Sequence, residues 1–311
     1  MNDYLVLILG IICAGFGGEF FVRGAVRLAL WLRVSAGIIG VTVTAFATSS
    51  PELFVAISSA MSGTPRISLG DALGSNIVNV ALILGLALVF GRIYGQRKEV
   101  KVNYWSATLS PVIIGILAID GVLSRVDGIL LLTAFVVWVT HVTIVARGQR
   151  SSTSKELGAH SDWLSVVYCA IGLGLLVVAG RLIVSGASGI ATALGIGSFV
   201  IGSVIVAFGT SVPELATVLI SRMKKHDDIG LNTILGSNIF NGLLIIGIAA
   251  TICPITFART EVMTVLAFGI VTVGMTLPSR NGYLDRWRGI VLLVLYCVFV
   301  LTTIYLHTSG I

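Results

Sequence analysis

Long apolar runs fill almost the whole chain, and no other feature restricts its fold as much. Hydrophobic residues make up 56% of the 311 residues and charged residues only 11%, whereas soluble domains carry about 25% charge. A helix that crosses a bilayer needs about 20 mostly apolar residues. Such runs predict an all-α polytopic membrane protein with ten transmembrane helices, at roughly 4–31, 36–62, 68–91, 103–120, 126–147, 163–190, 198–223, 229–253, 258–278 and 286–307.

Most Lys and Arg residues lie in loops on one side of the predicted spans, and this distribution predicts how the chain is oriented in the membrane. The net charge of +6 would suit a nucleic-acid partner, but loop position explains it better. Only Arg66, Arg125 and Arg259 lie in loops on one side of the ten spans. Because loops rich in Lys and Arg face the cytoplasm, both termini are expected outside it, and no nucleic-acid partner is expected. The loops on the cytoplasmic side hold Arg33, Arg92, Arg97, Lys98, Lys101, Arg147, Arg150, Lys155, Arg222, Lys224, Lys225, Arg280, Arg286 and Arg288.

The second half of the chain repeats the first when the sequence is shifted so that Thr48 meets Thr210. At this single offset, "TSSPEL" at 48–53 meets "TSVPEL" at 210–215, and "LGSNI" at 73–77 meets the same letters at 235–239. Five spans per half make the second half enter the membrane from the opposite side. Inverted repeats are typical of secondary transporters, whose sites lie near the bilayer midplane. We expect two inverted five-helix repeats, at 1–147 and 163–311, joined by a short cytoplasmic linker at 148–162.

Each repeat carries a proline followed by a glutamate inside an apolar run. Proline removes a helical hydrogen bond and clashes with the carbonyl four residues earlier, so Pro51 and Pro213 predict loosened carbonyls around 45–48 and 207–210. Such carbonyls are tolerated at membrane depth where they face protein, water or an ion. A bare carboxylate at that depth is costly, so Glu52 and Glu214 need partners.

Polar neighbours of the glutamates complete a predicted cage of oxygen atoms. Calcium takes six to eight oxygen ligands, carboxylates among them, and two glutamates offset its double charge. A kinked helix would explain one motif, and polar contacts between helices would explain the Ser and Asn residues, but two copies in register favour a cation site. The absence of clustered Cys and His disfavours transition metals. The neighbours are Thr48, Ser49, Ser75 and Asn79, and in the second half Thr210, Ser211, Ser237 and Asn241.

Other charged residues within the apolar runs receive structural interpretations. Glu19 and Arg23 are four residues apart, a favourable spacing for an ion pair on a helix. A structural pair is favoured there over a second transport site. Asp71, Asp120 and Asp127 lie early in a span or at span ends, where a wetted entrance or a solvated rim explains them equally well.

The motifs resemble those of a known family. "GVTVTAFATSSPEL" with "ALGSNIVN", and "GSVIVAFGTSVPEL" with "ILGSNIFN", are similar to the two α-repeats of sodium/calcium exchangers, within the cation/calcium antiporter superfamily. These α-repeats fall at about 40–80 and 202–242. The resemblance implies ten helices and sodium/calcium exchange by alternating access, with the first and sixth helices sliding past the remaining core.

The resemblance also implies roles for particular residues. Glu52 and Glu214 would supply the calcium carboxylates, joined by the carbonyls of Thr48 and Thr210. Sodium would compete for the same site. Asn79 and Asn241 would line its centre. The sodium ligands would be Glu52, Glu214, Ser49, Ser211, Ser75, Ser237 and the carbonyls of Ala45 and Ala207.

Differences between this sequence and the family pattern indicate which branch of the family it resembles most. Potassium-dependent and some microbial members carry aspartate where this chain has Asn241, which weakens the case for potassium. Proton/calcium exchangers carry asparagine-based motifs around their glutamate, so the threonine-serine motif favours sodium, with proton coupling as the alternative. A cation channel suits inverted repeats less well, and no HExxH motif supports an enzyme. We expect a prokaryotic plasma-membrane protein, with no cofactor besides the transported calcium and sodium and no obligatory protein partner.

Overall fold

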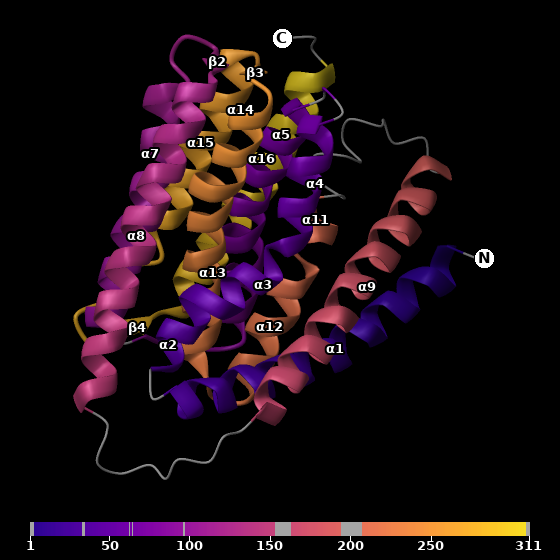
Figure 1. The fold of residues 1–311 in the computed structure, drawn as a ribbon. Helices are drawn as coiled ribbons and strands as arrows, with labels where there is room; N and C mark the ends of the chain where they lie inside the picture. The colour runs from indigo at the N-terminus through magenta and orange to yellow at the C-terminus, as the bar shows by residue number, and fades with distance from the viewer. Residues whose placement is uncertain are drawn as a thin grey trace.

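The protein is helical over nearly all of its described length (Figure 1). The computed structural model describes residues 3–32, 35–61, 63, 65–95, 97–152, 163–193 and 207–308. The predicted linker therefore lies mostly outside the described residues, and its first part, 148–152, belongs to a helix. The predicted range 198–223 is described only from residue 207 onward.

The first half contains eight described α-helices and two π-helical segments. The α-helices are α1 (Asp3–Leu32), α2 (Ala36–Ile39), α3 (Ala45–Thr48), α4 (Ser50–Met61), α5 (Pro65–Ile77), α6 (Gly85–Val89), α7 (Arg97–Leu117) and α8 (Arg125–Ser152). The π-helical segments are η1 (Gly40–Thr44) and η2 (Val78–Leu84).

The second half follows the same order where it is described. Its α-helices are α9 (Trp163–Ala193), α11 (Ala207–Thr210), α12 (Val212–Met223), α13 (Asp227–Ile239), α14 (Ile246–Ile252), α15 (Arg259–Gly274) and α16 (Arg286–Thr308), with a π-helical segment η4 (Phe240–Ile245). η2 and η4 begin at equivalent positions of the sequence repeat, since the offset that brings Thr48 onto Thr210 also brings Val78 onto Phe240.

Helix length and hydropathy support membrane insertion. By these two criteria, four described stretches can cross a bilayer, 68–89, 125–147, 227–252 and 286–303, and a fifth if 16–32 and 37–48 count as one bent span. Helices also occupy the described parts of the other predicted ranges. The number of ten spans stays a prediction.

Two of these stretches form the centre of the molecule. Within the apolar windows of 68–89 and 227–252, 83% and 89% of the residues are buried, against 17% for the windows in α8 and α16. A buried span is covered by other helices, whereas an exposed apolar span leaves its side chains to lipid. The central stretches contain "LGSNI" in both copies, so the repeated polar residues lie in the protein interior.

α1 and α9 pack against each other along one side of the molecule, inclined to the other helices (Figure 1). Glycines bring the two backbones close together. A Cβ atom on Gly24 would lie 2.6 Å from the backbone nitrogen of Cys169, and one on Gly172 would lie 2.5 Å from that of Phe21. Small residues at such crossings allow close helix packing within membranes.

Two short strand pairs connect the halves at opposite ends of the bundle. β1 (Ile93–Tyr94) pairs antiparallel with β4 (Tyr283–Leu284), and β2 (Val122–Leu123) with β3 (Ile255–Thr256). Figure 1 shows β2 and β3 at the top and β4 at the lower left. Each pair therefore joins a loop of one half to a loop of the other.

Candidate cation site

The repeated Thr-Ser-x-Pro-Glu motif interrupts a helix in both halves. Ser49 separates α3 from α4 with φ −85° and ψ 8°, and Ser211 separates α11 from α12 with φ −86° and ψ 7°. Pro51 and Pro213 then lie in the first turn of the following helix, where a missing N–H costs little. The predicted helix distortion is confirmed, and it falls two residues before each proline.

Two of the carbonyls predicted to be loosened, those of Ala45 and Ala207, already accept hydrogen bonds. The N–H of Ser49 donates to the carbonyl of Ala45 at 3.0 Å, and that of Ser211 to the carbonyl of Ala207 at 3.2 Å. Both carbonyls also accept a threonine hydroxyl, Thr48 Oγ1 at 3.4 Å and Thr210 Oγ1 at 3.1 Å. A cation reaching Ala45 or Ala207 would have to replace the threonine hydroxyl.

The two glutamates are fully buried and differ in their partners. Glu214 Oε1 accepts hydrogen bonds from Ser49 Oγ and Ser237 Oγ, both at 3.1 Å. Within the described part of the chain, both oxygens of Glu52 are buried and have no hydrogen-bond partner. The Ser49 bond joins the motif of the first half to the glutamate of the second.

Hydroxyl groups from four helices, α3, α5, α11 and α13, gather beside these carboxylates. Ser75 Oγ lies 3.5 Å from Thr210 Oγ1, which brings α5 and α11 together. Thr48, Ser75, Ser211 and Ser237 are all buried, and the hydroxyl of Ser211 has no partner among the described residues. The oxygen-bearing side chains predicted from the repeats therefore converge in the protein interior.

Asparagines from the central helices connect the two copies of "LGSNI". Asn76 Nδ2 donates to the backbone carbonyl of Asn238 at 3.3 Å, and Asn238 Nδ2 donates to that of Asn76 at 3.2 Å. Asn79 Nδ2 donates to Asn238 Oδ1 at 3.2 Å. Asn79 and Asn241 lie in η2 and η4, and π-helical turns are frequent at functional sites. Both side-chain polar atoms of Asn241 are buried without a partner in the described region.

Unpaired polar atoms are concentrated in this region. Each buried polar group that lacks a hydrogen bond costs about 1–3 kcal/mol, and a charged one costs more. A fold keeps such groups together when a ligand completes them. Among the described residues, the unpaired side-chain atoms here are both carboxylate oxygens of Glu52, Glu214 Oε2, Asp71 Oδ2, Asn76 Oδ1, Asn79 Oδ1, Ser211 Oγ and both polar atoms of Asn241.

Carboxylates alone do not form a metal centre here. Among the described residues, no three His, Cys, Asp or Glu side chains lie close enough to hold one metal ion. A cation at Glu52 and Glu214 would therefore depend on neutral oxygens as well, which is the ligand mixture that hard cations such as calcium accept.

A comparison with protein families identifies the family to which the chain belongs. The family described as sodium/calcium exchanger protein matches residues 3–144 and 164–305. The chain belongs to the sodium/calcium exchanger family. The match spans both halves and both copies of the motif.

Relatives of this exchanger family support the assignment over nearly the full length. The uncharacterized membrane protein MJ0091 of Methanocaldococcus jannaschii is 33% identical over 94% of this chain and 95% of its own length. The sodium/calcium exchanger MaX1 of Methanosarcina acetivorans is 25% identical over 98% of this chain and 99% of its own. A solved structure of the sodium-calcium exchanger NCX_Mj, soaked with Na⁺ and Sr²⁺, has a TM-score of 0.81 and 30% identity, covering 95% of this chain and 97% of that one.

Family membership fixes the general class of the protein. It is an integral membrane protein, and the family and its structures support cation/calcium antiporter activity rather than an enzymatic reaction. Sodium and calcium are transported substrates in this family and not resident cofactors.

Three residues of the polar centre were missing from the sequence-based site. Asn76 and Asn238 belong to the repeated "LGSNI" segment, so the repeat already contained their signal. Asp71 was expected at a wetted entrance or a solvated rim. The solvated rim is wrong, because Asp71 is 7% exposed and its Oδ1 accepts a hydrogen bond from Thr210 Oγ1 at 3.2 Å.

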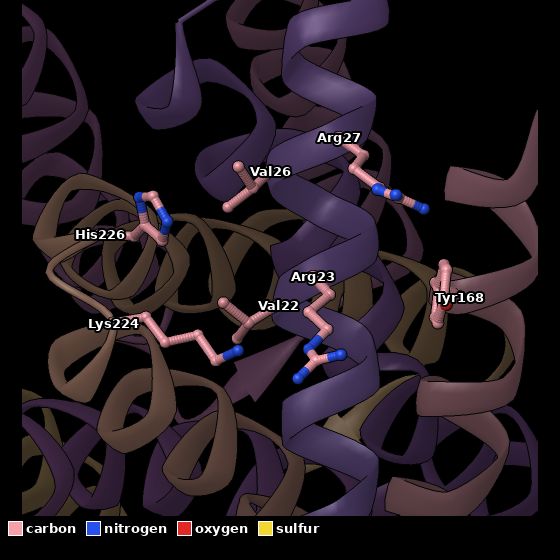
Figure 2. Close-up of a pocket in the computed structure, with 7 residues that line it drawn as sticks. All are labelled: Val22, Arg23, Val26, Arg27, Tyr168, Lys224 and His226. Carbon is pink, nitrogen blue, oxygen red and sulfur yellow. The ribbon is translucent and has the colours of Figure 1, made fainter. Parts of the chain in front are cut away.

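The predicted ion pair of α1 is confirmed, and it has an additional partner. Glu19 binds Arg23 within α1 and also Lys224, which follows α12. A cavity of about 260 Å³ lies beside this cluster. Figure 2 shows Arg23 and Arg27 on one helix, Tyr168 on a neighbouring helix, and Lys224 and His226 on the opposite side of the first helix. The interaction ties α1 to the loop between α12 and α13, as expected for a structural pair.

Proposed function

We propose that the protein is a sodium/calcium antiporter that binds both ions in turn at the buried oxygen site between its two halves. The observation that carries this proposal is the hydrogen bond from Ser49 to Glu214. It brings the two repeated motifs to one place, where Glu52 and Glu214 are buried with three of their four oxygens unpaired in the described structure.

The chemistry of the site suits competition between calcium and sodium. One calcium ion offsets two carboxylates, and two or more sodium ions can replace it at the same oxygens. The proposed ligands are Glu52, Glu214, Ser49, Ser211, Ser75, Ser237, Asn79, Asn241 and the carbonyls of Thr48, Thr210, Ala45 and Ala207.

We propose that the chain crosses the membrane ten times, as two inverted repeats. The strand pairs support this arrangement. The offset that brings Thr48 onto Thr210 also brings the start of β1 onto the start of β3, and it brings β2 onto β4 to within one residue. Related strand pairs at opposite ends of the bundle fit halves of opposite orientation. The positive-inside rule then puts both termini outside the cytoplasm, in the plasma membrane of a prokaryote.

Alternating access would move α1 and α9 against the remaining helices. Both helices lie along one side of the bundle (Figure 1), and close contacts at Gly24 and Gly172 join them to each other. A pair packed this closely can move as one unit past the central helices, which hold the site. Calcium would then leave the cell as sodium enters.

Calcium uptake into proteoliposomes tests the proposal. Vesicles are loaded with sodium or with choline, and a third set carries a proton gradient, with external potassium varied in each. We expect uptake only with internal sodium and no requirement for potassium. Uptake driven by the proton gradient alone would instead establish a proton/calcium exchanger, and flux without any counter-ion would indicate a channel.

A further inference from the structure

We infer that Asp71, together with the hydroxyls of Ser75 and Thr210, holds a monovalent cation beside the glutamate pair. The inference rests on the proposed function, and it assigns to Asp71 the role of a sodium ligand. It concerns a residue that has no acidic counterpart in the second half, where Thr233 occupies the equivalent position of the repeat.

Asp71 is a buried acid without a compensating positive charge. It is 7% exposed, and its Oδ2 has no hydrogen-bond partner within the described part of the chain. None of the ion pairs formed by the described residues includes Asp71 or either glutamate. A carboxylate that stays ionised at this depth needs a compensating charge, and a bound cation supplies one.

The oxygens around Asp71 are arranged to share that cation. Thr210 Oγ1 lies 3.2 Å from Asp71 Oδ1 and 3.5 Å from Ser75 Oγ. Asp71 and Ser75 are four residues apart on α5 and therefore share a helix face. These three oxygen-bearing groups come from two helices, α5 and α11, and α11 ends at the break that precedes Glu214.

The grouping of the acids separates this position from the calcium position. Asp71 acts electrostatically on Glu52, yet the three acids do not come together tightly enough to hold one metal ion among them. Asp71 therefore flanks the glutamate pair. Asp71, Glu52 and Glu214 together carry three negative charges when ionised. Three sodium ions neutralise all three charges, whereas a single calcium ion leaves one of them uncompensated.

Thr233, at the position of the second half equivalent to Asp71, shows how a neutral side chain is bonded there. Thr233 is buried and donates its hydroxyl to the carbonyl of Ile229 at 2.7 Å, within its own helix. That hydroxyl is satisfied locally. The carboxylate of Asp71 instead accepts a bond from another helix and keeps one oxygen unpaired among the described residues.

The test compares two transport modes of the full chain in proteoliposomes, with Asp71→Asn as the variant. Sodium-dependent calcium flux requires both ions, whereas calcium–calcium exchange in sodium-free buffer requires only the calcium position. We expect the half-saturating sodium concentration to rise about tenfold, since a hydrogen-bonded charged ligand is lost. The half-saturating calcium concentration for calcium–calcium exchange should change far less. Asp120→Asn removes an exposed acid and serves as the control.

A binding measurement gives the same comparison without transport. Sodium that binds only the folded protein raises its melting temperature, so the detergent-purified chain is melted in sodium chloride and in choline chloride at equal ionic strength. We expect Asp71→Asn to need about tenfold more sodium for the same stabilisation. If Asp71→Asn does not fold, Asp71→Thr, which introduces the residue found at the equivalent position of the second half, is measured instead, with a shift expected in the same direction.

The outcomes separate this inference from the proposed function. Wild-type protein without any sodium-dependent calcium flux would overturn the proposed function. Wild-type flux with an unshifted sodium dependence in Asp71→Asn would overturn the inference alone. Equal shifts in sodium and calcium dependence would also overturn it, because Asp71 would then belong to the calcium position.

Discussion

Asn76 and Asn238 each donate a side-chain hydrogen bond to the backbone carbonyl of the other, at 3.3 and 3.2 Å. The two residues occupy equivalent positions of the repeat, so each half makes the same bond to its counterpart. This reciprocal pair fixes how the two central stretches, 68–89 and 227–252, face each other. The buried glutamates lie on the helices packed beside them.

Replacing either asparagine is expected to destabilise the protein. Asn76→Ala and Asn238→Ala each leave a buried carbonyl short of a donor, at a cost of about 1–3 kcal/mol. The double variant should cost less than the sum of the two, because both residues belong to one network. Melting temperatures in detergent check this. Asn103→Ala breaks a buried amide pair with Asn232 elsewhere, and we expect it to lower stability while leaving the ion dependence of transport unchanged.

Removing either buried carboxyl charge is expected to abolish calcium transport. Glu52→Gln and Glu214→Gln keep the shape of the side chain and remove the charge that a divalent cation needs. Calcium flux in proteoliposomes measures the effect, with the amount of purified, monodisperse protein matched between variants. Wild-type flux in either variant would exclude the proposed calcium position.

The serines that bind Glu214 are expected to tune calcium affinity. Ser49→Ala and Ser237→Ala each remove one of the two hydrogen bonds at Glu214 Oε1. Each bond orients the carboxylate, and we expect the half-saturating calcium concentration to rise about tenfold in either variant. Ser50→Ala is a matched control, because its hydroxyl bonds to the carbonyl of Phe46, one helical turn earlier, and not to Glu214. An equal effect of all three variants would show that serine content, and not the contact with Glu214, matters.

Introducing an acid at Asn241 is expected to change ion selectivity. Both polar atoms of its side chain are buried and unpaired among the described residues, so Asn241→Asp places an additional negative charge at the centre of the polar region. Calcium flux measured with sodium and potassium varied, across a range of pH, checks this. An unchanged profile would contradict the central position of Asn241.

The contact between α1 and α9 is expected to tolerate no side chain at Gly172. A Cβ atom there would approach the backbone of Phe21 to 2.5 Å, so Gly172→Ala must separate the helices or fail to fold. We expect lower stability and slower exchange. Gly174→Ala, two residues along the same helix, has no described atom within 4 Å of its added Cβ and should behave like the wild type in both assays.

Much of the site could be predicted because the chain contains it twice. The repeat identified Glu52 and Glu214 together, and helix spacing placed Thr48 and Ser49 beside Glu52. The repeated "LGSNI" segment contained Ser75 and Ser237. Asp71 could not be found in this way, since its counterpart Thr233 is not acidic. Its burial depends on α11, whose Thr210 lies far from Asp71 in the sequence and donates to it only in the folded chain.

Other features depended on tertiary contacts that the sequence pattern does not encode. η2 and η4 have the same apolar composition as an ordinary helix, and nothing in residues 78–84 predicts a π-helical turn. Glu19 was correctly paired with Arg23 because helix spacing is local. Its second partner, Lys224, lies 205 residues away, and only the fold brings it there.

The two strand pairs show why a sequence repeat need not be a folding unit. β1 and β2 belong to the first half, yet each of them pairs with a strand of the second half. A fragment ending before α9 would keep both strands without these partners, and unpaired strand edges promote association with other chains. Each half would therefore need the other during biogenesis, and separately expressed halves should be recovered as a folded protein only when they are produced in the same membrane.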